Sequence, residues 1–193
     1  MHSSFVAVPY ALLATLLGCA AFTDLRSRRI PNKLVLAGIL VAIAVHGVAM
    51  SMGTLSPAGR TWWAPLAGLV TGFALLLPLY LMHAMGAGDV KLMAMVGAFV
   101  GAPTMLAVAL YTLLAGGLLS LLFMLGRGVA VQALTNVRFM LTDLAHRAGT
   151  GQGARLAPLQ LTAARLPYAV AIALGTAAAI VWPMARFLNG VLG

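Results

Sequence analysis

Long apolar runs separated by short polar clusters dominate this chain. A helix needs about 20 apolar residues to cross the ~30 Å hydrocarbon core of a bilayer. The apolar runs predict six spans, at residues 5–23, 33–50, 62–84, 90–100, 104–125 and 166–188. The fourth run is too short to cross alone. We therefore expect its helix either to begin within the headgroup region or to be tilted and partly buried in the bundle.

Composition supports the same class of protein. Hydrophobic residues make up 62% of the chain and charged residues 8%, whereas soluble globular domains are about 45 to 50% apolar. The sequence predicts an all-α polytopic membrane protein, a bundle of six transmembrane helices in which residues 1–193 form one domain. The net charge of +9 comes from Lys and Arg scattered between apolar runs. This scatter indicates topology signals and contacts with lipid headgroups rather than nucleic-acid binding.

The only long polar stretch spans residues 126–165. Within it, Ala130, Leu134, Val137 and Leu141 recur at helical spacing, which predicts an amphipathic helix on the membrane surface. Six spans place both termini on one side, with Arg60 and Arg186. The other side then carries Arg26, Arg28, Arg29, Lys33, Lys91, Arg127, Arg138, Arg147, Arg155 and Arg165. Positive residues favour the cytoplasm, so that side is expected to be cytoplasmic and both termini to lie outside.

The acidic residues carry the candidate chemistry. The chain has only three, Asp24, Asp89 and Asp143, and no Glu. Carboxylates near bilayer depth are costly and mark function. Asp24 ends the first span and Asp89 opens the fourth, both at the predicted cytoplasmic boundary. If the bundle brings them together, they share one proton, and the pair can activate a water against a peptide carbonyl. Such chemistry requires no metal or cofactor.

Helix dipoles suggest how the two carboxylates divide this work. Asp24 follows the C-terminal end of a helix, where the dipole is negative, while Asp89 lies where a helix begins and the dipole is positive. We therefore expect Asp89 to be the general base and Asp24 the general acid.

Other interpretations of these residues remain open. Asp89 could cap a helix after a glycine turn, Asp24 could pair with Arg26 or Arg28, and Asp143 is expected to be solvated. A small transporter could use both carboxylates as a proton or cation relay, and a non-catalytic subunit of a secretion machine is a third class. Transport would favour carboxylates near the midplane, whereas both lie toward one face here.

Two further patterns have structural interpretations. The histidines His46, His83 and His146 lack metal-ligand spacing, so we expect no metal site. The pairs Gly68-x3-Gly72 and Gly97-x3-Gly101 are typical of close helix packing.

Three sequence blocks together resemble the signatures of type IV prepilin peptidases, the GxGD membrane aspartic proteases. They are Asp24 with Arg28-Arg29-Ile30-Pro31-Asn32, then Gly86-Ala87-Gly88-Asp89-Val90-Lys91-Leu92, and then Pro167-Tyr168-Ala169-Val170-Ala171-Ile172. The resemblance implies that the short basic leader of prepilins or pseudopilins is cut at the cytoplasmic face of the bacterial inner membrane. It also implies that Asp24 and Asp89 are catalytic, with Gly86 and Gly88 as the motif glycines. Supporting or substrate-binding residues are then Arg28, Pro31, Asn32 and Lys91.

The chain departs from the long members of that family, which carry an N-terminal cytoplasmic region with paired CxxC cysteines and a methyltransferase activity. Here Cys19 is the only cysteine and the first span begins near Phe5. We therefore expect neither that region nor methylation of the product. The short form is similar to the CpaA/TadV peptidases of tight-adherence (Flp) pilus systems, so Flp-type prepilins are the expected substrates.

Overall fold

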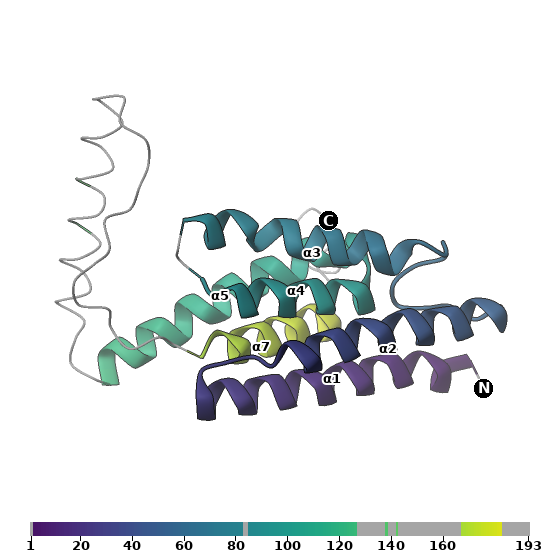
Figure 1. Ribbon diagram of the computed structural model, residues 1–193, viewed down its shortest axis with the longest axis horizontal. Helices are drawn as coiled ribbons and strands as arrows, with labels where there is room; N and C mark the ends of the chain where they lie inside the picture. The colour runs from purple at the N-terminus through teal and green to yellow at the C-terminus, as the bar shows by residue number, and fades with distance from the viewer. Residues whose placement is uncertain (1, 83–84, 127–137, 139–141, 143–166, 183–193) are drawn as a thin grey trace, which may run out of the picture.

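Six helices form a bundle in the part of the chain that the computed structural model describes, residues 2–82, 85–126, 138, 142 and 167–182 (Figure 1). They are α1 (His2–Ser27), α2 (Asn32–Ser51), α3 (Ala64–Leu81), α4 (Ala87–Val100), α5 (Ala102–Gly126) and α7 (Tyr168–Val181). No strand occurs among these residues beyond an isolated bridge between Ser56 and Gly59. The predicted all-helical class is confirmed.

Four of the described helices are long and apolar enough to cross a membrane: α1, α2, α3 and α5. The helices α4 and α7 have only 14 residues each. The described part of the chain is therefore that of a helical membrane protein with four candidate spans. The six-span layout and its orientation stay predictions. The predicted amphipathic helix falls almost entirely outside the described residues.

Several predicted helix boundaries are wrong by up to one turn. The helix α4 begins at Ala87 rather than at Val90, so Asp89 lies inside its first turn. Likewise α1 continues to Ser27, which places Asp24 in its last turn rather than beyond it. Pro103 lies in the first turn of α5, where proline removes no hydrogen bond. The break between α4 and α5 is Gly101, whose φ is +76°.

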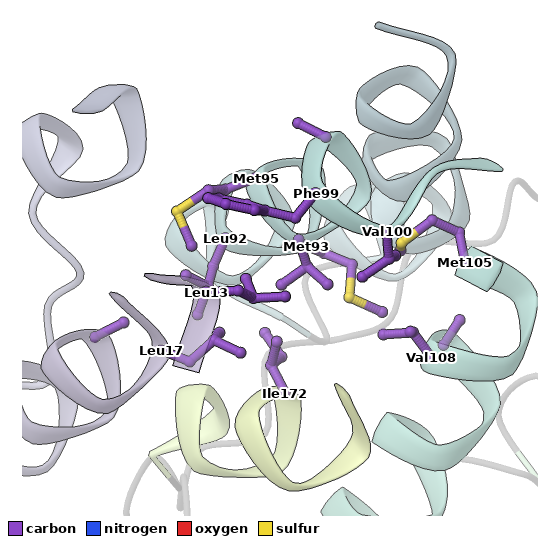
Figure 2. Packing of buried hydrophobic residues seen from close by; sticks show 14 of the residues in the cluster. Leu13, Leu17, Leu92, Met93, Met95, Phe99, Val100, Met105, Val108 and Ile172 are labelled. Carbon is purple, nitrogen blue, oxygen red and sulfur yellow. The ribbon is translucent and has the colours of Figure 1, made fainter. Parts of the chain in front are cut away.

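The short helix α4 is the centre of the bundle (Figure 1). Its side chains are buried at Val90 and at every position from Leu92 to Val100. Figure 2 shows this helix packed against side chains of three others, namely Leu13 and Leu17 of α1, Met105 and Val108 of α5, and Ile172 of α7. Because other helices enclose it, α4 need not cross the bilayer alone. The expectation that this segment is buried in the bundle is confirmed.

Glycines allow α3 and α4 to approach each other at backbone distance. A Cβ at Gly68 would collide with the carbonyl of Gly97, and one at Gly97 would collide with the carbonyl of Gly68. A Cβ at Gly72 would meet the carbonyl of Met93 in the same way. The predicted packing role of the Gly68-x3-Gly72 pair and of Gly97 is therefore confirmed.

His46 forms hydrogen bonds with the connection between α2 and α3, at the opposite end of α2 from Asn32. It is buried, and its ring nitrogens lie 2.8 Å from the Ser56 hydroxyl and 2.9 Å from the Thr61 carbonyl oxygen. A carbonyl only accepts, so Nε2 donates to Thr61. Both ring nitrogens are used within the fold, which gives this histidine a structural role.

The glycine contact between α3 and α4 gives a first test. Replacing Gly97 with Ala places a methyl group against the α3 backbone, and overpacking of this kind costs about 1–3 kcal/mol. Gly47→Ala is the matched control, because a Cβ there would have no neighbour within 4 Å. Thermal unfolding in detergent should show a lower midpoint for Gly97→Ala than for Gly47→Ala. Equal midpoints would show that the close approach contributes nothing to stability.

Candidate active site

The candidate site lies at the end of the bundle where α1 ends and where α4 and α7 begin (Figure 1). Asp24 occupies the last turn of α1, Asp89 the first turn of α4, and Ala169 the first turn of α7. Three segments far apart in the sequence therefore contribute to one region. The turn that joins α1 to α2 adds a fourth.

Asp24 is buried, with 7% of its surface exposed. Its Oδ2 accepts a hydrogen bond of 3.1 Å from the backbone N–H of Ala169, 145 positions further along the chain. Ala169 is the second residue of α7, and the first N–H groups of a helix have no partner within it. The carboxylate of α1 thus satisfies an amide at the start of α7.

Asp89 folds back on the glycine turn that precedes it. Its Oδ2 accepts a hydrogen bond of 3.1 Å from the backbone N–H of Gly86, while its own N–H donates to the Gly86 carbonyl. This reciprocal pair closes the first turn of α4. The capping interpretation of Asp89 thus agrees with the structure, although the cap residue itself is Gly86. Such a cap leaves the second carboxylate oxygen available for other chemistry.

The two carboxylates influence each other electrostatically. Burial raises the pKa of Asp89 above its ordinary value, the hydrogen bond from Gly86 opposes this, and the negative charge of Asp24 raises it further. The structure therefore brings Asp24 and Asp89 within electrostatic reach of each other. A raised pKa means that Asp89 holds its proton to higher pH. This opposes the dipole argument that made Asp89 the easier group to ionise, because that argument omitted burial.

The connection between α1 and α2 packs over the start of α4. Lys91 Nζ donates a 3.2 Å hydrogen bond to Asn32 Oδ1. The side chain of Ile30 lies against Gly88, where an added Cβ would be 3.4 Å from it. These contacts join the Asp24 and Asp89 sequence blocks directly. Among the predicted supporting residues, Asn32, Lys91 and Gly88 are thus in contact across the two blocks.

Arg28 and Pro31 shape the connection through their backbones. Arg28 adopts φ +52°, and its N–H donates a 2.8 Å hydrogen bond to the Asp24 carbonyl, which ends α1. Its side chain is exposed. Pro31 stands immediately before α2 as its N-terminal cap residue. The structure gives both residues a role in the turn and places neither side chain against a carboxylate.

An apolar cavity of about 410 Å³ lies at the same end of the bundle. It lies between the end of α1, the second half of α5 and the start of α7, and it is lined by Leu25, Gly116, Leu119, Leu122, Phe123, Pro167, Tyr168, Val170 and Ala171. Leu25 directly follows Asp24. Tyr168 directly precedes Ala169, the hydrogen-bond partner of Asp24. The cavity therefore lies next to the contact between α1 and α7, although neither acid is among its lining residues.

Sequence reasoning missed this cavity and the contribution of Ala169. The lining residues are ordinary apolar residues from three separate segments, and only tertiary packing assembles them. The Ala169 contact uses a backbone N–H, which has no side-chain signature. The one signal present was the Pro167-Tyr168-Ala169 block, which the resemblance singled out without assigning it a role.

An enclosed helical bundle with two coupled carboxylates at one end is the arrangement expected of a membrane aspartic peptidase. Residues 11–121 match the model of the type IV leader peptidase family, so the chain belongs to this family. The matched range holds Asp24 and the whole Gly86–Lys91 block but ends before α7. No curated protein and no solved structure shows significant similarity to the chain. The resemblance to prepilin peptidases is thereby confirmed at the level of the family, which is one of peptidases.

Electrostatic coupling between the acids can be measured directly. Because the chain has only three acidic side chains, 13C labelling of Asp carboxyl carbons gives three resonances, and Asp89→Asn identifies that of Asp89. Replacing Asp24 with Asn removes a negative charge, so the pKa of Asp89 should fall. An unchanged Asp89 titration in Asp24→Asn would show that the two carboxylates do not interact.

Proposed function

We propose that this protein is a membrane-embedded aspartic endopeptidase that removes the short basic leader from prepilins or pseudopilins. The observation that carries the proposal is the placement of Asp24 and Asp89. They come from different helices, lie at one end of the bundle, and interact electrostatically. Membership of the type IV leader peptidase family supports this reaction class.

The chemistry follows from two carboxyl groups that hold one proton between them. The ionised carboxylate takes a proton from a water molecule as the water oxygen attacks the peptide carbonyl carbon. The protonated carboxyl group donates its proton to the developing oxyanion. The tetrahedral intermediate then collapses and the C–N bond breaks: the leaving nitrogen receives the proton that the first carboxylate took from water, and a hydroxyl group of the intermediate returns its proton to the other carboxylate, which restores the starting pair. Asp24 and Asp89 are the two proposed catalytic residues.

The surroundings of the acids support a peptide with an apolar segment as substrate. The cavity beside Asp24 is lined almost entirely by apolar groups, which suits the apolar helix that follows the leader of a prepilin. Gly86 is exposed and carries no side chain, so an extended peptide can approach Asp89 from this side, while Gly88 makes room for Ile30. Lys91 and Asn32, with the turn at Arg28 and Pro31, hold the two blocks in place.

The distribution of basic residues supports a cytoplasmic site. Arg26, Arg28 and Arg29 lie at the end of α1, and Lys33 and Lys91 lie at the same end of the bundle, whereas Arg60 lies between α2 and α3. Under the positive-inside rule the acids then face the cytoplasm of the bacterial inner membrane, in a single peptidase domain of residues 1–193. The short form favours Flp-type prepilins as substrates.

A proton or cation transporter would use the same carboxylates differently. Transport sites are built near the midplane, where both faces can reach them in turn. Asp24 and Asp89 lie at helix ends on one side instead, which favours an enzyme that works from that side.

Cleavage of a synthetic prepilin-like peptide by the purified protein tests the proposal. Asp24→Asn and Asp89→Asn should each lower the cleavage rate by about 10³-fold or more, because each removes one half of the acid–base pair. Asp143→Asn removes the only other acidic side chain and should leave the rate within a few-fold of the wild-type value. Circular dichroism checks that each variant is folded. Cleavage that persists in both active-site variants would exclude the proposed chemistry.

A further inference from the structure

The first turn of α7 lies outside the residues that match the family model, yet it contacts a proposed catalytic acid. Asp24 reaches this turn from the last turn of α1, and both partners are buried, Ala169 completely and Asp24 to all but 7%. A hydrogen bond between buried partners is geometrically demanding, because neither group can turn to water instead. The contact therefore fixes where the Asp24 carboxylate points.

We propose that the backbone N–H of Ala169 is a positioning group of the active site, which holds Oδ2 of Asp24 and leaves Oδ1 to act on water. The inference rests on the proposed function and extends it to α7. Asp89 is held in a corresponding way, by the backbone N–H of Gly86. Each acid of the pair is thus fixed by one amide at the start of a helix.

The position of Ala169 in its helix suits this role. An N–H at the second helical residue has no acceptor within the helix, so its hydrogen bond to Asp24 replaces no hydrogen bond of α7. The following N–H, that of Val170, already donates to the Pro167 carbonyl at 3.3 Å. The partial positive charge at a helix N-terminus also favours a negative partner there. The Asp24 carboxylate therefore matches both the free N–H group and the partial positive charge of the first turn of α7.

Charged and titratable groups around Asp24 define what a pH experiment reports. Asp89 of α4 interacts with Asp24 through its charge, and the Tyr168 phenol of α7 interacts in the same way with Asp89. Arg26 on α1 and Lys33 on α2 are exposed, and Lys91 is engaged by Asn32. A change at Ala169 that alters none of these groups reports on Asp24 itself.

Ala169→Pro is the variant that removes this donor. Proline is tolerated in the first turn of a helix because the N–H it lacks is unpaired there. We expect kcat for peptide cleavage to fall at least about 10-fold with KM nearly unchanged, since one hydrogen bond to a charged group is lost. Because the lost donor contacts one of the two acids, the pH profile of kcat should also differ from that of the wild-type protein.

The chain offers a matched control. The helices α2 and α7 begin alike, each with a proline as its N-terminal cap residue, Pro31 and Pro167. Lys33 is therefore the second residue of α2, as Ala169 is the second residue of α7. Lys33→Pro, measured against Lys33→Ala, makes the same backbone change at the same helical position without touching an acid, and should leave kcat and the pH profile unaltered. Ala169→Gly retains the N–H and should keep the wild-type pH profile. A wild-type kcat and pH profile in folded Ala169→Pro would overturn the proposal.

A second measurement does not depend on that variant folding or on the enzyme cutting a prepilin. In the 1H–15N spectrum of the wild-type protein, the Ala169 amide proton should lie downfield, because it is hydrogen-bonded to a carboxyl group. Its resonance should move in Asp24→Asn and keep its wild-type position in Asp89→Asn. An Ala169 amide that is unaffected by Asp24→Asn would overturn the positioning role. Failure of the wild-type protein to cleave prepilin peptides, with the Ala169 resonance responding as expected, would instead overturn the proposed function alone.

Discussion

The enclosure of α4 by the other helices is the constraint on which the rest of the structure depends. A helix of 14 residues cannot cross a bilayer by itself, so its polar ends must be accommodated within protein. The glycine contacts between α3 and α4 bring the two backbones close enough to achieve this. With α4 fixed at the centre, the residues at its start are held at a set depth and against set neighbours. Asp89 is one of these residues, and the position of the site follows from the packing of α4.

Helix ends supply the second constraint. The first turn of every helix presents N–H groups without intrahelical partners, and near a bilayer they need acceptors from the protein. Asp89 accepts a hydrogen bond from the Gly86 N–H at the start of its own helix, while Asp24 accepts one from the Ala169 N–H at the start of α7. The same bonds that satisfy the backbone also orient two acids whose burial would otherwise be costly. The contacts that satisfy the backbone at this end of the bundle are therefore also those on which the proposed chemistry depends.

The site also joins segments that are far apart in the chain. The turn between α1 and α2 contacts α4 through Asn32 and Lys91 and through Ile30 and Gly88. On the other side, α7 contributes an amide to Asp24 and the wall of the apolar cavity. A movement of either segment would change the geometry of an acid, because each touches the element that carries one. This explains how a bundle with few charged residues holds two of its three carboxyl groups in defined positions.

The sequence by itself determined the helical membrane class and the family, and it predicted that Asp24 and Asp89 form a pair at one face. Each of these depends on local patterns: apolar runs of spanning length, scarce carboxylates at their ends, and a compact Gly86–Lys91 block. Only the tertiary structure decided that α4 is enclosed, that Ala169 donates to Asp24, and that burial raises the pKa of Asp89. The boundaries of α1 and α4 lie beyond their apolar runs because local backbone contacts close them, the Gly86–Asp89 pair at the start of α4 and the turn at Arg28 at the end of α1. A backbone amide and an apolar wall have no signature in a single sequence, because what gives them their role is the neighbour that folding brings to them.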